Sequence, residues 1–183
     1  MKKISCAILA LAILAPAAHA AGLSAALTFS YIGMADSGFR EVYGAGGFMP
    51  GLRLEAALGG SVSIYAAYGY FTQKGETPLM GHECDSTQHH AAAGAAWRRS
   101  LSPKLDGFLH AGLAYVRYSE KAMDEEISGG ALGAEAGAGL DFKISSRLFV
   151  QPFVSYLYAG DTVDGAKVKL GGFRAGLGLG VRW

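Results

Sequence analysis

The sequence predicts an all-β fold, an eight-stranded antiparallel up-and-down transmembrane β-barrel with short periplasmic turns and longer extracellular loops. Three observations predict it. Apolar residues alternate with small or charged ones along residues 169–183, and the last residue is aromatic. All 27 glycines follow residue 20, in a sequence with only 17% charged residues. Removal of a leader would leave about 163 residues, which is enough for roughly eight membrane strands of about 10 residues with their connections.

The last strand shows the alternation most clearly. One parity of residues 169–183 is apolar from Phe173 to Trp183, and the other is glycine with Arg174 and Arg182. Because side chains alternate with a period of two along a strand, these two sets lie on opposite faces. A barrel in lipid places apolar side chains outside and small or charged ones in its lumen, so this pattern favours a membrane barrel over a soluble sandwich.

The first twenty residues have the pattern of a secretory signal peptide. Lys2 and Lys3 precede an apolar stretch at residues 4–15, and Ala18-His19-Ala20 is a small-x-small cleavage site. The apolar stretch is too short to span a bilayer. We therefore predict a cleaved signal peptide at residues 1–20, an outer-membrane barrel domain at residues 21–183, and export to the cell outer membrane. Cleavage changes the formal net charge from +1 to −1, which argues against nucleic acid as a partner.

The first four strands are predicted at residues 23–33, 43–58, 62–72 and 89–98. Each has an apolar set on the parity expected to face lipid. These outward residues are Leu23, Ala25, Leu27, Phe29 and Tyr31, then Leu52, Leu54 and Ala56, then Val62, Ile64, Ala66, Tyr68 and Tyr70, and finally Ala91, Ala93, Ala95 and Trp97.

The last four strands are predicted at residues 105–118, 131–143, 148–158 and 169–183. Their charged residues fall on the parity that also carries glycine. The outward residues are Leu109, Ala111, Leu113 and Tyr115, then Leu132, Ala134, Ala136, Ala138, Leu140 and Phe142, then Leu148, Val150, Val154, Tyr156 and Tyr158, and finally the apolar set of the last strand.

The predicted connections alternate in length. Tight turns with Gly, Ser or Pro are expected at residues 59–60, 100–104 and 145–146. Longer polar loops are expected at residues 34–40, 73–88, 119–129 and 160–166. The short set would face the periplasm and the long set the cell exterior.

With these strands assigned, the chain resembles the small eight-stranded outer-membrane barrels of Gram-negative bacteria, the OmpA-like, OmpX-like and opacity-type proteins. The resemblance covers nearly the whole chain after the leader, and it is one of pattern and ending. Residues 178–183 resemble the signal read by the barrel-assembly machinery. That signal begins with a polar residue, and here Gly176 occupies the polar position, which is a departure from the pattern. The residues assigned to this signal are Gly178, Val181 and Trp183. Shifted by two residues, the signal fits better at Arg174, Gly176, Leu179 and Val181.

Ten ionisable residues are predicted to point into the lumen as a structural charge network. They are Arg53, Glu55, Arg98, Asp106, His110, Glu135, Asp141, Lys143, Arg174 and Arg182. An eight-stranded barrel is just wide enough for side chains to fill, so these groups are expected to pair across the lumen. Glu135 and Arg174 lie at similar heights and are an expected pair. Inward aromatic residues, Tyr65, Phe71, Phe108 and Phe153, would narrow the lumen further. The alternative is a narrow or gated ion path.

A group of potential metal ligands lies in the second long loop, but it is interpreted as an ordinary polar surface segment. The group comprises His82, Glu83, Cys84, Asp85, His89 and His90. Their spacing matches no closed zinc or copper motif, so no metal or cofactor is predicted. Cys84 is the only cysteine after the leader, which leaves either a free thiol or a cross-link to a partner.

The resemblance implies a function without fixing it, since the family includes adhesins, structural proteins and some lipid-modifying enzymes. No His-x-Ser pair of the kind carried by lipid A deacylases occurs, and we predict no enzymatic activity. The leading hypothesis is a scaffold that displays extracellular loops for surface interaction or adhesion. The alternatives are a narrow channel for ions or small solutes and, third, a lipid-modifying enzyme. Expected partners are outer-membrane lipids and lipopolysaccharide, the barrel-assembly machinery, and an unidentified surface ligand.

Overall fold

The computed structural model describes residues 22–76, 82–122, 125–163 and 165–183. The predicted signal peptide, residues 1–20, lies outside these residues. The elements are β1 (Leu23–Met34), α2 (Ser37–Tyr43), β2 (Gly46–Gly59), β3 (Val62–Glu76), β4 (Glu83–Ser102), β5 (Leu105–Ala122), β6 (Glu125–Lys143), β7 (Leu148–Val163), β8 (Ala166–Lys169) and β9 (Gly172–Arg182).

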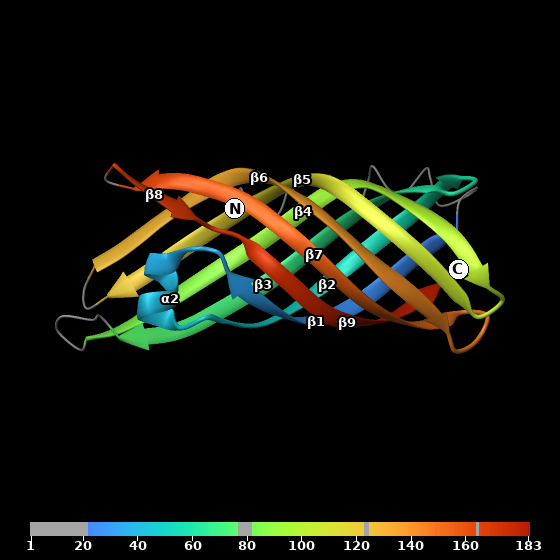
Figure 1. Ribbon diagram of the computed structural model, residues 1–183, viewed down its shortest axis with the longest axis horizontal. Helices are drawn as coiled ribbons and strands as arrows, with labels where there is room; N and C mark the ends of the chain where they lie inside the picture. The colour runs from blue at the N-terminus through green and yellow to red at the C-terminus, as the bar shows by residue number, and fades with distance from the viewer. Residues whose placement is uncertain (1–21, 77–81, 123–124, 164) are drawn as a thin grey trace, which may run out of the picture.

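The eight long strands close into one antiparallel barrel. Each strand pairs with its neighbours in sequence from β1 to β7, and β9 pairs with both β7 and β1. The short strand β8 instead pairs with the far end of β7. In Figure 1 the tilted strands wrap around the long axis, with α2 and β8 at one end and the C-terminus at the other. The predicted eight-stranded barrel is confirmed.

The side-chain pattern gives the barrel an apolar exterior and a packed interior. Leu27, Leu113 and Leu132 are 71%, 75% and 79% exposed, whereas the inward Asp141 and Gln151 are almost fully buried. Such exposure of large apolar side chains is expected where lipid, rather than water, surrounds the surface. Aromatic and large aliphatic residues cover both ends of this exterior, from Tyr31, Tyr70 and Tyr158 to Trp97 and Trp183.

Glycine on the inner face makes room for aromatic rings from the adjacent strand. Phe108 is paired with Gly139, and a Cβ atom at Gly139 would lie 2.4 Å from Cζ of the Phe108 ring. Phe149 is likewise paired with Gly180, where a Cβ atom would lie 2.2 Å from the ring. The glycines of the inward parity therefore allow large rings to lie against the wall of a narrow lumen.

Two predicted boundaries, next to α2 and β8, were wrong. The second strand begins at Gly46 rather than Tyr43, because residues 37–43 form α2. Asp36 caps this helix by accepting a hydrogen bond from the Phe39 N–H, and Gly44 ends it with φ of 84°. The last barrel strand begins at Gly172 rather than residue 169, because Lys169 belongs to β8. Among the described residues, no helix has the length and apolar character required to span a bilayer.

The predicted long loops are mostly hairpin extensions of the barrel strands. The β3–β4 pairing continues through Thr72↔Thr87 and Lys74↔Asp85, and the β5–β6 pairing continues to Ala122↔Glu125. The described residues of the predicted loops at 73–88 and 119–129 are thus almost all in strands. Cross-strand polar pairs such as Lys74–Asp85 stabilise these extensions. In the predicted loop at 160–166, residues 160–163 belong to β7 and Ala166 to β8, and these two strands are paired.

A substitution on the lipid face tests this orientation. Leu177 lies near the middle of β9, is 58% exposed and pairs with Phe29 and Pro152. Leu177→Arg should lower the free energy of unfolding by about 2–4 kcal/mol, because arginine at the bilayer midplane is poorly solvated. The measurement is urea unfolding of the refolded barrel in lipid bilayers.

Leu58→Arg is the matched control, since Leu58 is 60% exposed beside the β2–β3 turn. The cost at this position should be about 1 kcal/mol or less, because arginine can reach the interface there. Equal costs at the two sites would contradict the assigned lipid face of β9.

Candidate functional site: the filled lumen

The structure brings the ten predicted interior residues together in two groups. Seven form one chain of ion pairs near the end with the short turns, here called the ion-pair chain. In order along the chain they are Arg53, Glu55, Arg98, Asp141, Arg182, Asp106 and Lys143. The other three, His110, Glu135 and Arg174, form a second group deeper in the barrel, here called the Glu135 group.

The ion-pair chain joins five strands across the lumen. Arg53 Nη2 lies 3.3 Å from Glu55 Oε2 on the same strand, β2. Arg98 of β4 donates hydrogen bonds both to Glu55 and to Asp141 of β6.

The chain then continues towards the turns. Arg182 Nη2 of β9 lies 2.9 Å from Asp141 Oδ2, and its Nη1 lies 3.3 Å from Asp106 Oδ2 of β5. Lys143 Nζ completes the chain 2.6 Å from Asp106 Oδ1. Because each shared carboxylate has cationic partners from different strands, the chain cross-links the wall of the barrel.

The Glu135 group is almost fully enclosed. Glu135 Oε1 lies 3.0 Å from Arg174 Nη2 and 3.1 Å from His110 Nε2. The side chains of His110 and Glu135 are 1% and 3% exposed. Arg174 Nε also donates to Ser155 Oγ at 3.0 Å. The expected Glu135–Arg174 pair thus lies within hydrogen-bonding distance, with an imidazole added to it.

Neutral polar side chains that the sequence reasoning did not select also join both groups. Gln151 Nε2 donates to Asp141 Oδ1 at 2.7 Å, Ser63 Oγ donates to Glu55 Oε1, and Ser155 contacts Arg174. Gln151, Ser63 and Ser155 each lie on the inward parity of their strand, so the alternation in the sequence could have identified them as interior residues. These contacts occupy carboxylate lone pairs and arginine donors that the ion pairs leave open.

Aromatic rings fill the space beside the guanidinium groups. The Cζ atom of Arg53 lies 4.1 Å from the centre of the Tyr65 ring and 5.4 Å from that of Phe108. Arg98 lies 4.8 Å from the Phe108 ring, and Arg174 lies 5.5 Å from the Phe153 ring. Cation–π contacts of this kind favour the charged side chains within the enclosed lumen.

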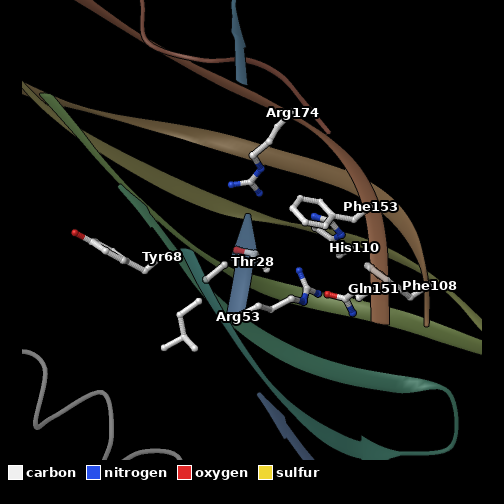
Figure 2. Close-up of a pocket in the computed structure, with 10 residues that line it drawn as sticks. Thr28, Arg53, Tyr68, Phe108, His110, Gln151, Phe153 and Arg174 are labelled. Carbon is white, nitrogen blue, oxygen red and sulfur yellow. The ribbon is translucent and has the colours of Figure 1, made fainter. Parts of the chain in front are cut away.

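A small cavity separates the ion-pair chain from the Glu135 group. Its volume is about 20 Å³, and it is lined by Arg53, Arg174, His110 and their neighbours. Figure 2 shows Arg174 and Arg53 reaching towards the cavity from opposite sides, while Tyr68 points away from it. The Nδ1 atom of His110 is buried and has no hydrogen-bond partner among the described residues.

The end of the lumen beneath α2 is apolar. Phe39 and Tyr43 of α2 pack against inward side chains of β1 to β4. The buried members of this apolar cap are Ile32, Met34, Phe39, Tyr43, Met49, Phe71 and Cys84. Beside it, a second apolar cluster contains Val116, Tyr118, Leu157 and Leu170. Apolar packing therefore fills the lumen where the charged groups end.

Asp36 holds α2 over this end of the barrel. Its carboxylate accepts hydrogen bonds from the backbone N–H groups of Phe39, at 2.9 Å, and of Lys169, at 3.0 Å. Partial burial opposes ionisation of Asp36, but the backbone hydrogen bonds from Lys169, Phe39 and Gly38 outweigh it and lower the pKa of the carboxyl group. The same carboxylate thus connects α2 to β8.

The potential metal ligands at residues 82–90 are divided between the two faces of a strand. From Glu83 onwards this segment is β4, and Cys84 and His90 are buried whereas Glu83, Asp85 and His89 are exposed. No group of three or more His, Cys, Asp or Glu side chains suited to a metal ion occurs within the described part of the chain. The interpretation of this segment as a surface loop was wrong, because the β3–β4 hairpin continues through it.

The residues of the predicted assembly signal lie at the end of β9. Gly178 faces the lumen beside Gln151 and Thr28, whereas Trp183 is 66% exposed. Val181 pairs with Ala25 of β1 and Leu148 of β7, where the barrel closes. Recognition of these residues by the assembly machinery stays a prediction.

Comparisons with known proteins agree with this architecture. The family model described as "Outer membrane protein beta-barrel domain" matches residues 4–181. No curated protein sequence gives a significant match.

Solved structures show the same fold at low sequence identity. The outer membrane protein OprG from Pseudomonas aeruginosa has a TM-score of 0.71 at 12% identity, with 90% of this chain and 96% of that chain covered. Neisserial surface protein A has a TM-score of 0.62 at 14% identity, with coverages of 88% and 95%. Ail, the attachment invasion locus protein of Yersinia pestis, was solved with the heparin analogue sucrose octasulfate; its TM-score is 0.55 at 14% identity, with coverages of 89% and 97%.

The Glu135–Arg174 pair gives a test of the enclosed charges. Arg174→Ala should lower the free energy of unfolding by about 3–5 kcal/mol, because it leaves Glu135 buried without its guanidinium partner. The double variant Glu135→Gln, Arg174→Gln should lose clearly less, because two neutral amides replace the two charges. Urea unfolding of refolded protein measures both. If the double variant were less stable than Arg174→Ala, the cost would not come from an unpaired carboxylate.

Proposed function

Because this chain belongs to the outer membrane protein β-barrel family, we propose that it is a non-enzymatic, non-conducting barrel of the outer membrane that displays its extracellular end for surface interaction. Export through the predicted signal peptide is part of this proposal. In this orientation the short turns face the periplasm, and α2 with the extended hairpins faces the cell exterior.

The observation that carries the proposal is that side chains fill the lumen along its length. The ion-pair chain crosses the periplasmic half, the Glu135 group lies above it, and the apolar cap closes the outer end beneath α2. The cavity between the two charged groups, at about 20 Å³, has room for little more than one water molecule. This packing supports a scaffold rather than the alternative of a narrow channel.

The outer ends of β3 to β6 form a polar sheet surface suited to contact with other molecules. One cross-strand row contains hydroxyl side chains, Thr72, Thr87, Ser119 and Ser128. The next row outward alternates in charge, with Lys74, Asp85, Lys121 and Glu126. Lys121 Nζ and Glu126 Oε2 lie 3.5 Å apart. In these rows β3 to β6 are paired with one another, and among the described residues only β3 beyond Gly69 and β6 before Gly133 present an outer edge without a strand partner. Charged side chains such as Lys74 and Glu126 on these two strands disfavour pairing with another sheet edge.

Membrane lipids and lipopolysaccharide are the partners proposed for the rim of the barrel. Tyr70, His89 and Arg117 form a cross-strand row directly below the hydroxyl row. His89 is oriented by a 2.6 Å hydrogen bond between its Nδ1 and the Tyr68 hydroxyl. Aromatic rings and cations at this level suit the interface between acyl chains and phosphate groups. The barrel-assembly machinery is the partner proposed during biogenesis.

An attachment role has one further support. The attachment invasion locus protein of Yersinia pestis, as its name states, is an attachment protein, and it shares the fold. That likeness is one of fold alone, so the ligand of this chain is to be found by experiment on its own extracellular surface.

Conductance distinguishes the scaffold from the channel. Purified barrel in planar bilayers should show no steady single-channel current, because the ion-pair chain and the apolar cap both block the lumen. A variant in which residues 36–44 are replaced by a short Gly/Ser linker should also be silent, since the ion-pair chain remains. A porin of known conductance in the same bilayers is the control. Steady, ion-selective currents from the wild-type protein would overturn the scaffold and support the channel.

Trimming the β5–β6 hairpin tests surface display. Replacing residues 120–127 by Asn-Gly removes the outer charged row of these strands and keeps the Ser119↔Ser128 pair. The trimmed barrel should still fold, as judged by different electrophoretic mobility before and after boiling in SDS. Proteins cross-linked to wild-type barrel on intact cells should be lost from the trimmed barrel. An unchanged set of cross-linked proteins would contradict a role for this hairpin.

A further inference from the structure

The cavity between Arg53 and Arg174, here called the arginine cavity, has an unusual set of lining residues. The two arginines, Thr28, His110 and Gln151 provide its polar groups, and none of the residues that line it carries a carboxylate. Arg53, His110 and Gln151 are 8%, 5% and 1% exposed. In Figure 2 the two guanidinium groups lie on opposite sides of the space, with Thr28 and Gln151 beside them. The polar part of the lining therefore has two cations and no carboxylate, and the rest of the lining comes from Leu52, Ala67, Tyr68, Phe108 and Phe153.

The ion-pair chain has one more base than acid, and one of its two basic ends lies at this cavity. It alternates between base and acid and has a base at each end, so four basic groups share three carboxylates. The end at Lys143 lies at the periplasmic rim, where its side chain is 29% exposed and meets water. The other end is Arg53, whose side chain is only 9% exposed. Its single carboxylate, Glu55, is also held by Arg98.

Both arginines keep one donor group free of protein partners. Arg53 uses Nε and Nη2 to reach Glu55, and Arg174 uses Nε for Ser155 and Nη2 for Glu135. Within the described residues, neither Nη1 atom has a hydrogen-bond partner. His110 contributes differently, because its Nε2 is engaged by Glu135 and its Nδ1 would donate only in the imidazolium form. The direct contacts available to a ligand are thus two guanidinium groups and the Thr28 hydroxyl.

We propose that the arginine cavity binds a single small monovalent anion of the size of chloride. A cavity of about 10–15 Å³ holds one water molecule, so about 20 Å³ admits one small ion and excludes sulfate or a phosphate ester. A water molecule would satisfy the donors but would leave the excess positive charge at Arg53 uncompensated. An anion satisfies both, through charge-assisted hydrogen bonds from Arg53 and Arg174. The cation–π contact of Arg53 with Tyr65 holds the guanidinium at the wall of the cavity.

Thermal unfolding in different sodium salts tests the site. The refolded barrel is exchanged into detergent with sodium chloride, sodium bromide or sodium gluconate at equal ionic strength, and its midpoint is measured by SDS mobility after stepped heating. Wild-type protein should have a midpoint several degrees higher in chloride and bromide than in gluconate, because only the small anions bind the folded state. Equal midpoints in the three salts would overturn the proposal.

Two variants with the same change of charge locate the effect. Arg53→Gln removes the cation at the cavity, while Glu55 keeps Arg98 and Ser63 as partners, and it should abolish the difference between chloride and gluconate. Lys143→Gln removes the cation at the other end of the same chain and should retain the difference. Loss of the difference in both variants, or in neither, would show that the salt effect does not arise at the arginine cavity.

Crystals of wild-type protein grown in sodium bromide provide a test that depends on no variant. Anomalous scattering at the bromine edge should give a peak between Arg53 and Arg174. A well-defined water molecule there, with no anomalous peak, would show that the cavity is only hydrated and would overturn the proposal.

Discussion

Closure of the sheet is the constraint on which the rest of this structure depends. A strand can cross a bilayer only when all of its backbone N–H and C=O groups are paired, because lipid offers no hydrogen-bond partner. Pairing of β9 with β1 supplies the last row of these bonds, from Ser24↔Arg182 to Met34↔Gly172. Once eight strands have closed, the diameter is fixed and the lumen is narrow. Every inward side chain must then pack, and every inward polar group must form its hydrogen bonds or ion pairs, within that lumen.

The charged interior is a consequence of this confinement. Arginine and carboxylate side chains in so narrow a space cannot all reach bulk water, so each must be paired or stacked. In the ion-pair chain, each carboxylate is shared by two cations, so every charged group has a partner of opposite sign. The shared carboxylates are those of Glu55, Asp141 and Asp106. Glycines opposite Phe108 and Phe149 provide the space for the rings that pack beside these charges. The alternation of base and acid also leaves the chain with one more base than acid, and its two ends are Arg53 on the inner side and Lys143 at the rim.

The two ends of the lumen are closed by different physical means. Ion pairs close the half with the short turns, where water can reach Lys143 and Arg182 at the rim. Apolar packing closes the outer end, where Phe39 and Tyr43 of α2 lie against Phe71 and Met49. The hydrogen bonds of Asp36 to Phe39 and Lys169 fasten this closure to β8. The outer surface can therefore carry polar hairpins for contact with other molecules while the interior stays filled.

The sequence was sufficient to predict the eight barrel strands, their lipid faces and the set of charges that point inward. It could do so because a period of two is a local property, readable at Leu177 and Arg174 without knowledge of any other strand. Apart from the Glu135–Arg174 pair, which was expected from strand heights, the acid–base pairing depended on the tertiary structure. Arg98, Asp141 and Arg182 lie on three strands whose relative heights follow from the register of the closed barrel. The same holds for the apolar cap, because Phe39 and Tyr43 reach the inward side chains of β1 to β3 only where α2 folds back over the end of the barrel. The helix that Asp36 caps was not predicted, because its seven residues are too few for a periodic apolar pattern. The arginine cavity was likewise beyond the sequence, because an enclosed space depends on how side chains from facing walls fill the lumen.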